Sequence, residues 1–186
     1  AYPSSLPDKC IQDGFDFVVA GEGEEAMLRL ITNIEGEHAP GIVNATYIQE
    51  MDSIPFPGRH LIDINSFAYN IDDGRGTTLI TSRGCPYTCS FCSKEVWQRG
   101  TRFHSTEYVI SELEHIIDKY DFKHFLFLDD TITIHKKRLL ELCARMEPLN
   151  IKWRCYARTT TTREMLIAMK RAGCVEIGVG VESGSQ

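Results

Sequence analysis

Hydrophobic positions repeat with a helix or strand period in two stretches of the chain, and a segment between them has neither period. Residues 15–20 (FDFVVA) form an apolar run, and a helical pattern follows the Gly-Glu-Gly-Glu of residues 21–24 through Ile34 to Gly36. We expect a strand and then a helix whose first-turn glutamates suit the helix dipole. Residues 37–76 lose the period and are interrupted by proline and glycine. We expect a linker or strap there.

From residue 77 onward, predicted strands and helices alternate. The expected strands cover 77–82, 124–128, 151–157 and 174–181, and the expected helices cover 106–119, with Ser105 as N-cap, 135–146 and 162–172. This alternation predicts a parallel sheet with right-handed crossovers.

The last two predicted strands are apolar on one side only. Ile151, Trp153, Cys155 and Ala157 alternate with Lys152, Arg154, Tyr156 and Arg158, and Val175, Ile177, Val179 and Val181 alternate with Glu176, Gly178, Gly180 and Glu182. A doubly wound sheet would require apolar residues on both faces. We therefore expect a partial barrel with helices outside and a wet or ligand-filled concavity inside. In this register the concave side receives Arg154, Tyr156, Arg158, Glu176 and Glu182, and the helices cover Trp153, Ile177 and Val179.

Composition narrows the possible functions. With 186 residues, 42% of them hydrophobic, the chain can bury one core. A formal charge of -6 argues against nonspecific nucleic-acid binding, and no apolar run has the roughly 20 residues of a membrane span. Seven unevenly spaced cysteines favour reduced thiols and a metal site over a disulfide framework. We expect a cytoplasmic protein.

The residues with the clearest chemistry form a CxxxCxxC motif after the strand at 77–82. Cys85, Cys89 and Cys92 supply three soft thiolates. A four-iron cluster usually takes four, so three would leave one iron open for a ligand. Zinc with a fourth ligand such as His104, or an electron-transfer cluster completed by a distant cysteine, are the alternatives. The position of the motif, at the carboxyl end of a barrel-like strand, favours an active site.

This segment resembles the radical S-adenosylmethionine (SAM) superfamily. The resemblance implies a partial (β/α)6 TIM-like barrel, of which residues 77–186 supply the first four strands. It also implies a 4Fe–4S cluster on Cys85, Cys89 and Cys92 that binds SAM and cleaves it reductively to a 5′-deoxyadenosyl radical. Phe91 occupies the aromatic position that lies near the adenine in that family.

The flanking motifs TSRGCPYTCSFC, FLFLDDT and GVGVESGSQ resemble the cobalamin-dependent branch, which includes methyltransferases and the anaerobic magnesium-protoporphyrin monomethyl ester cyclase. In that branch a cobalamin-binding domain precedes the barrel, and residues 16–24 resemble its last strand and helix. The implied organisation is a cobalamin-domain remnant over 1–36, a linker over 37–76 and the barrel over 77–186. The cobalamin-ligand motif DxHxxG is absent, so we expect cobalamin in the full-length protein but not on these residues alone.

Several residues are candidates for SAM contacts by the same resemblance. The usual Gly-Gly-Glu is here Leu128-Asp129-Asp130, and a carboxylate of Asp129 or Asp130 can still accept from an ammonium group. Glu182 would meet polar groups of SAM and Arg158 its carboxylate, unless these two form a structural ion pair. Gly178 and Gly180 would allow close approach to the backbone.

Three functions remain open. The first is methyl transfer or oxidative ring closure on a small molecule, with an electron donor such as flavodoxin or ferredoxin. The second is a methylthiotransferase, which needs an N-terminal three-cysteine cluster, whereas only Cys10 precedes the barrel. The third is a non-catalytic iron–sulfur or zinc module.

The chain starts at Ala1 without methionine and stops after the fourth strand, so we expect a fragment with negligible turnover. The strand at 174–181 would then self-associate or be poorly ordered.

Overall fold

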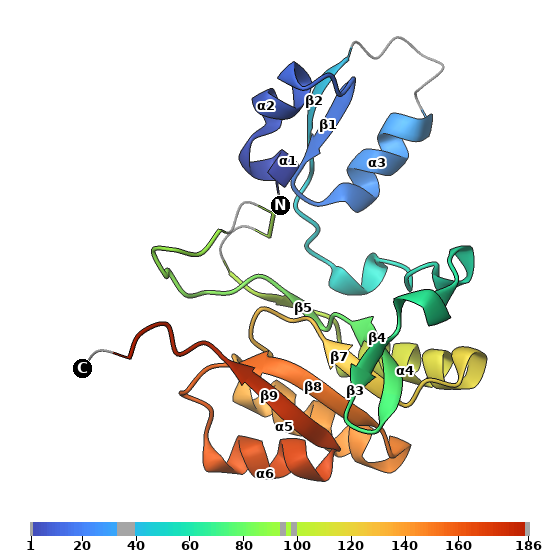
Figure 1. Cartoon of the computed structure of the whole chain (residues 1–186), viewed down its shortest axis with the longest axis vertical. Coiled ribbons are helices and arrows are strands. Elements are labelled where there is room, and N and C mark those ends of the chain that lie inside the picture. Colours follow the sequence, from blue (N-terminus) through green and yellow to red (C-terminus); the bar gives the residue numbers. More distant parts are fainter. Residues whose placement is uncertain (1, 33–39, 94–95, 98–99, 185–186) are drawn as a thin grey trace. The chain divides into compact units, whose positions relative to one another are not determined.

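The computed structural model describes residues 2–32, 40–93, 96–97 and 100–184. The chain divides into two compact units, one of Ala1–Ile54 with Pro86–Thr101 and the other of Pro55–Cys85 with Arg102–Gln186. Figure 1 labels most of their helices and strands. Within the described residues, no helix combines the length and apolar character that a membrane crossing requires.

Among its described residues, the smaller unit contains a two-stranded parallel sheet and three α-helices. Strand β1 (Phe17–Ala20) pairs with β2 (Gly41–Asn44), and helix α3 (Gly23–Thr32) follows β1. The expected strand and helix are therefore present, and the expected helix end, with Ile34 and Gly36, lies outside the described residues. The sequence pattern missed the short helices α1 (Tyr2–Ser5) and α2 (Pro7–Gln12), together with β2.

The larger unit is built on a five-stranded sheet in the order β3-β4-β7-β8-β9. Its strands are β3 (Tyr69–Ile71), β4 (Gly74–Leu79), β7 (His124–Phe127), β8 (Lys152–Ala157) and β9 (Cys174–Val179). Strand β3 is antiparallel to β4, and the other neighbours are parallel. Helices α4 (Thr106–Tyr120), α5 (Lys136–Met146) and α6 (Arg163–Arg171) alternate with the parallel strands, as predicted.

The described part of the expected linker, residues 40–76, is more ordered than the sequence pattern predicted. They hold β2, β3, the start of β4 and the 3-10 turns η1 (Met51–Ser53), η2 (Arg59–Leu61) and η3 (Ile64–Phe67). Gly74 and Gly76 suggested a linker, but they belong to β4. A β-carbon on Gly76 would lie 2.1 Å from the His124 carbonyl oxygen, so this glycine permits a close approach of backbone to backbone.

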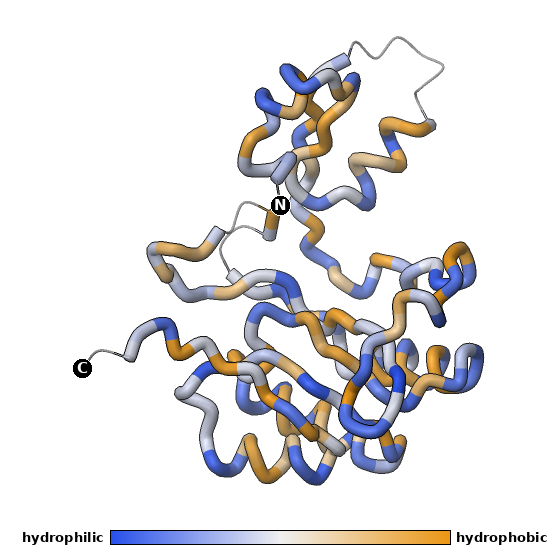
Figure 2. The backbone as a smooth tube through the Cα atoms, in the orientation of Figure 1, coloured by the Kyte–Doolittle hydropathy of each residue, from blue (hydrophilic) through white to orange (hydrophobic). Residues whose placement is uncertain are grey.

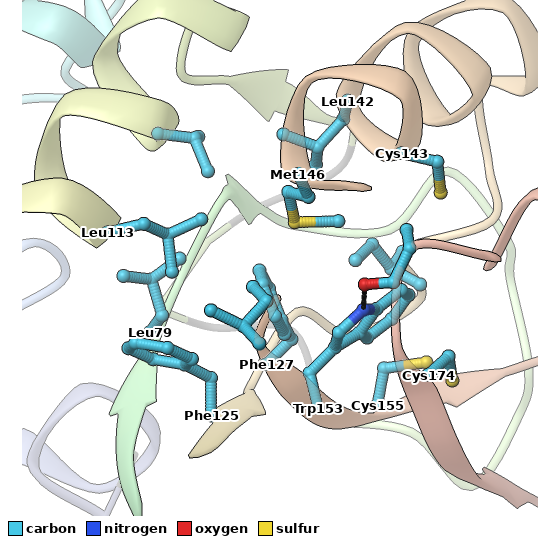
Figure 3. Close-up of a cluster of buried hydrophobic side chains, with 14 of the residues drawn as sticks. Leu79, Leu113, Phe125, Phe127, Leu142, Cys143, Met146, Trp153, Cys155 and Cys174 are labelled. Atoms are coloured by element: carbon cyan, nitrogen blue, oxygen red, sulfur yellow. Dashed lines mark hydrogen bonds between the residues drawn. The ribbon is translucent and has the colours of Figure 1, made fainter. Parts of the chain in front are cut away.

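Helices α4, α5 and α6 pack on one face of the sheet and bury a core against it (Figure 3). Phe127 meets Trp153 edge to face at 5.1 Å between ring centroids, and the Trp153 indole N–H donates to the Ala172 carbonyl at 2.8 Å. Hydrophobic and hydrophilic residues alternate along these helices (Figure 2), because only one side of each is buried. Ser105 caps α4 as predicted, accepting from the Tyr108 amide at 3.0 Å.

Strand β8 has the predicted polarity, but β9 does not follow the predicted alternation. Trp153 and Cys155 are buried, and Arg154 reaches Glu176 at 3.1 Å on the other face. The register shifts between Trp153, which pairs with Cys174, and Arg154, which pairs with Glu176. This bulge places Cys174 in the core in place of Val175, which is exposed.

Strand β9 is one of the two edge strands of the sheet in the part of the chain that the structure describes. Ile177 packs against the core as expected, whereas Val179, expected against the helices, is 41% exposed. The strand ends at Val179, so the expected extension to Val181 is wrong and Glu182 lies beyond the strand. Self-association through this edge stays a prediction.

Candidate functional site

The segment that carries the three motif cysteines is flanked by two short strands, which pair with each other as an antiparallel ribbon. Strand β5 (Ser82–Arg83) pairs with β6 (Arg102–Phe103), and the His104 amide donates to the Thr81 carbonyl at 3.0 Å. Gly84, directly after β5, has a φ of 84°, a conformation that glycine adopts without strain. Residues 84–101 are therefore connected at both ends to the ribbon, and we call them the cysteine loop.

Asp129, at the end of β7, lies beneath the start of this ribbon and is only 1% exposed. Its carboxylate accepts from the Thr81 amide at 3.2 Å, the Thr81 hydroxyl at 2.7 Å and the Ser82 hydroxyl. Burial raises the pKa of Asp129, and the hydrogen bonds from Ser82 and Thr81 act in the opposite direction. Of the two candidates for the SAM ammonium, Asp130 is the exposed one.

Arg138, on the first turns of α5, contacts both strands of the ribbon. Its guanidinium donates to the carbonyls of Thr81 and His104, both at 3.0 Å, and to the Thr81 hydroxyl at 3.3 Å. The same group lies 4.8 Å from the centroid of the Phe103 ring. Thr81 thus donates to Asp129 and accepts from Arg138, which links the two charged residues through one hydroxyl.

The motif cysteines are divided between the two units, since Cys85 belongs to the larger and Cys89 and Cys92 to the smaller. Cys85 and Cys89 are half-buried and Cys92 is exposed. No disulfide joins any of the seven cysteines, all of which lie among the described residues. Over those residues, no three His, Cys, Asp or Glu side chains converge as metal ligands would. The donor set itself, three reduced and accessible thiols, fits an iron–sulfur cluster.

The other four cysteines have the environment of small hydrophobic residues. Cys10, Cys143, Cys155 and Cys174 are all buried. Burial, and then the neighbouring Cys174, raise the pKa of the Cys143 thiol to about 12. The pKa of Cys155 is also raised, first by its hydrogen bond with Cys174 and then by burial. Both thiols are packed inside the hydrophobic core, so Cys143 and Cys155 are unsuited to completing a cluster on the cysteine loop.

Among the remaining predicted site residues, Phe91 belongs to the smaller unit, and Arg158, Gly178, Gly180 and Glu182 belong to the larger one. Phe91 is 69% exposed, Arg158 is half-buried just after β8, and Glu182 is exposed with a φ of 61°. A β-carbon on Gly178 would come within 2.8 Å of the Tyr156 ring, so packing within the sheet already accounts for that glycine. The roles of these residues toward SAM stay predictions.

His104, the residue considered as a fourth zinc ligand, is buried, and its ring stacks on Tyr108 with centroids 4.0 Å apart. Sequence reasoning missed the roles of Thr81, Ser82 and Arg138. The two hydroxyl residues shortly before the cysteine motif were the available signal, but Arg138 lies in an ordinary helical pattern.

The smaller unit holds a cavity of about 290 Å³ at the carboxyl ends of β1 and β2. Among its lining residues are Ser4, Gly21, Glu22 and Thr46. The Gly21 amide donates to the Ser4 hydroxyl at 3.0 Å. Crevices at this end of parallel strands are where open α/β sheets bind ligands.

Comparison with known proteins decides the family. The profile of the radical SAM superfamily matches residues 79–186, which include the cysteine motif and strands β7, β8 and β9. The chain belongs to the radical SAM superfamily. This radical SAM chain is 36% identical, over 91% of its length, to the uncharacterized methyltransferase PH0819 of Pyrococcus horikoshii, of which it covers 41%. It is 29% identical over 92% of its length to the anaerobic magnesium-protoporphyrin IX monomethyl ester cyclase of Cereibacter sphaeroides, covering 32% of that protein.

A solved structure supports the fold of this radical SAM chain. The methyltransferase TsrM from Kitasatospora setae, determined with cobalamin and a [4Fe-4S] cluster bound, matches 57% of the chain with a TM-score of 0.52 and 16% identity. The match covers 22% of TsrM. The predicted superfamily and partial barrel are thus confirmed, and the chain spans between about a third and two-fifths of the two curated relatives named above.

Proposed function

We propose that the protein is a radical SAM enzyme of the cobalamin-dependent type that performs methyl transfer or oxidative ring closure on a small molecule. The observation that carries the proposal is the CxxxCxxC loop directly after β4 and β5, in a chain that belongs to the superfamily. The named activities of its relatives, methyltransferase and cyclase, supply the two reaction types.

In this proposal Cys85, Cys89 and Cys92 hold the 4Fe–4S cluster, and Phe91 lies near the SAM adenine. Asp130, Arg158 and Glu182 bind its polar groups. Gly180 stays a candidate for close approach of SAM to the backbone, whereas the Tyr156 ring occupies the space beside Gly178. When bound, the cluster supplies the electron that cleaves SAM to methionine and a 5′-deoxyadenosyl radical. The buried and hydrogen-bonded state of Asp129 favours Asp130 for the ammonium contact.

Cobalamin is proposed for the whole protein. Residues 1–36 are assigned to the end of a cobalamin-binding domain, 37–76 to the connection and 77–186 to the barrel. The strand–loop–helix of β1 and α3 and the cavity beside Gly21 support that assignment, as does the cobalamin named for TsrM. Residues 1–186 contain no DxHxxG motif, so the proposal assigns them no cobalamin ligand. An electron donor of the flavodoxin or ferredoxin type and a cytoplasmic location complete the proposal.

Anaerobic reconstitution with iron and sulfide tests the cluster. The protein should take up about four irons per chain and show a visible spectrum that changes when SAM is added. Cys85→Ala, Cys89→Ala and Cys92→Ala should each abolish the cluster, and Cys143→Ala should retain it. A colourless protein that binds zinc, or a spectrum indifferent to SAM, would contradict the proposal.

A further inference from the structure

The ribbon that holds the cysteine loop is too small to be stable alone. It pairs only Ser82 with Phe103 and Arg83 with Arg102. An isolated two-stranded hairpin is at best marginally stable even when longer than this one. The ends of the loop must therefore be held by other parts of the larger unit.

Two buried or half-buried charged side chains supply that support from outside the ribbon. Asp129, from the end of β7, binds the first strand through Thr81 and Ser82. Arg138, from α5, donates hydrogen bonds to the carbonyls of Thr81, directly before β5, and of His104, directly after β6. The Thr81 hydroxyl joins the two groups.

The same contacts leave Asp129 poorly placed for direct ligand binding. Its carboxylate is 1% exposed and accepts three hydrogen bonds from the protein. A ligand would have to displace donors that are themselves buried, at a cost that such contacts rarely repay. Its chemistry suits a group that holds backbone in place.

We propose that Asp129 and Arg138 are positioning residues that fix both ends of the cysteine loop and thereby control how firmly the chain retains its cluster. The inference rests on the proposed function, since it assigns a role toward the same cluster. A loop whose ends are already ordered loses less conformational entropy when three of its residues bind a cluster, and groups behind metal ligands commonly orient those ligands. Both residues act through backbone and hydroxyl groups of the ribbon.

The first test measures the loop ends without any cluster. In the apoprotein, Asp129→Asn replaces the carboxylate that accepts hydrogen bonds from Thr81 and Ser82 with an amide. In Arg138→Gln the new side chain is too short to donate to both backbone carbonyls that the arginine binds. Amide hydrogen exchange at residues 81–83 and 102–104 should become at least about tenfold faster in each variant. Exchange in α6 should not change. Asp118→Asn and Arg145→Gln, which make the same charge changes on exposed parts of α4 and α5, should match wild type.

The second test measures the cluster. After anaerobic reconstitution, iron should pass to a chelator about tenfold faster from both variants than from wild type. Met169→Ala, which weakens the core at α6, separates general destabilisation from positioning, because its folded protein should release iron at the wild-type rate.

The outcomes distinguish the two proposals. Unchanged exchange at the loop ends, or wild-type iron release in both variants, would overturn the positioning role. If wild type takes up no iron, the proposed function fails, whereas the exchange measurement on apoprotein still decides whether Asp129 and Arg138 order the loop.

Discussion

The two faces of the five-stranded sheet differ in what their residues do. On the helix-covered face, Phe127, Trp153 and Cys155 are almost completely buried. On the opposite face, Tyr156 is 42% exposed, and Arg154 pairs with Glu176 in partial contact with solvent. Adjacent residues of one strand thus have opposite roles, because side chains alternate across a sheet. At β8 the covered face contributes stability, and the opposite face, which we call the open face, is in contact with solvent.

The largest difference in the free energy of unfolding should come from substitutions of two neighbouring residues at the end of β7. Phe127 is fully buried and Leu128 is 41% exposed. Phe127→Ala should lower the free energy of unfolding by about 3–5 kcal/mol, whereas Leu128→Ala should cost less than about 1 kcal/mol. Urea denaturation followed by circular dichroism measures both. Equal losses would show that the open face is packed as tightly as the covered one.

Trp153→Phe should have the next largest effect. The change keeps an aromatic ring but removes the indole N–H that donates to the Ala172 carbonyl at 2.8 Å. A buried unpaired carbonyl and a small cavity together should cost about 2 kcal/mol. Tyr156→Phe, three positions along on the open face, is the control and should be nearly neutral. A neutral Trp153→Phe would contradict the importance of this hydrogen bond.

The sequence predicted the three helices and the alternation of β8 better than it predicted β4 and β9. Ser105, the helices α4 to α6 and the alternation in β8 followed from local patterns, because each depends on residues close together in the chain. The bulge that exposes Val175 depends on pairing between β8 and β9, which the alternation of one strand does not encode. Likewise, glycines that suggested a linker are needed in β4 by the neighbouring His124.

In the candidate site, too, some features follow from the local sequence and others do not. The three cysteines are recognisable by their spacing, and their chemistry follows from residue type. The contacts of Asp129 and Arg138 join residues 48 and 57 positions from Thr81, so no local pattern reveals them. A carboxylate expected to meet SAM is therefore found under the ribbon, and its exposed neighbour Asp130 takes its place in the proposal.

Gly178 offers a smaller test, confined to the open face. A β-carbon there would lie 2.8 Å from the Tyr156 ring, so Gly178→Ala should cost about 1 kcal/mol while the ring shifts aside. In the background of Tyr156→Ala the same change should cost nearly nothing. A double-mutant cycle on the free energy of unfolding measures this coupling. If Gly178→Ala were equally costly in both backgrounds, the ring would not explain the glycine.

The smallest effect concerns charges at the amino-terminal ends of β7 and β8. Lys152, on the open face of β8, reaches Asp72 and Asp73, both at 2.7 Å, and His124 lies 2.9 Å from Asp73. Hydrogen bonds from Lys152, and then from His124, lower the pKa of Asp73 to about 2 from a usual value of 3.8. Folding favours the charged form, so this contribution is complete above about pH 4 and is lost as the pH falls toward about 2. Because the groups are exposed, this contribution to the free energy of unfolding should be small.

The free energy of unfolding of wild type relative to Asp73→Asn should therefore shrink between about pH 4 and pH 2. The effects of the other carboxylates cancel in this difference. A difference that stays constant over this range would show that these ion pairs do not contribute to folding.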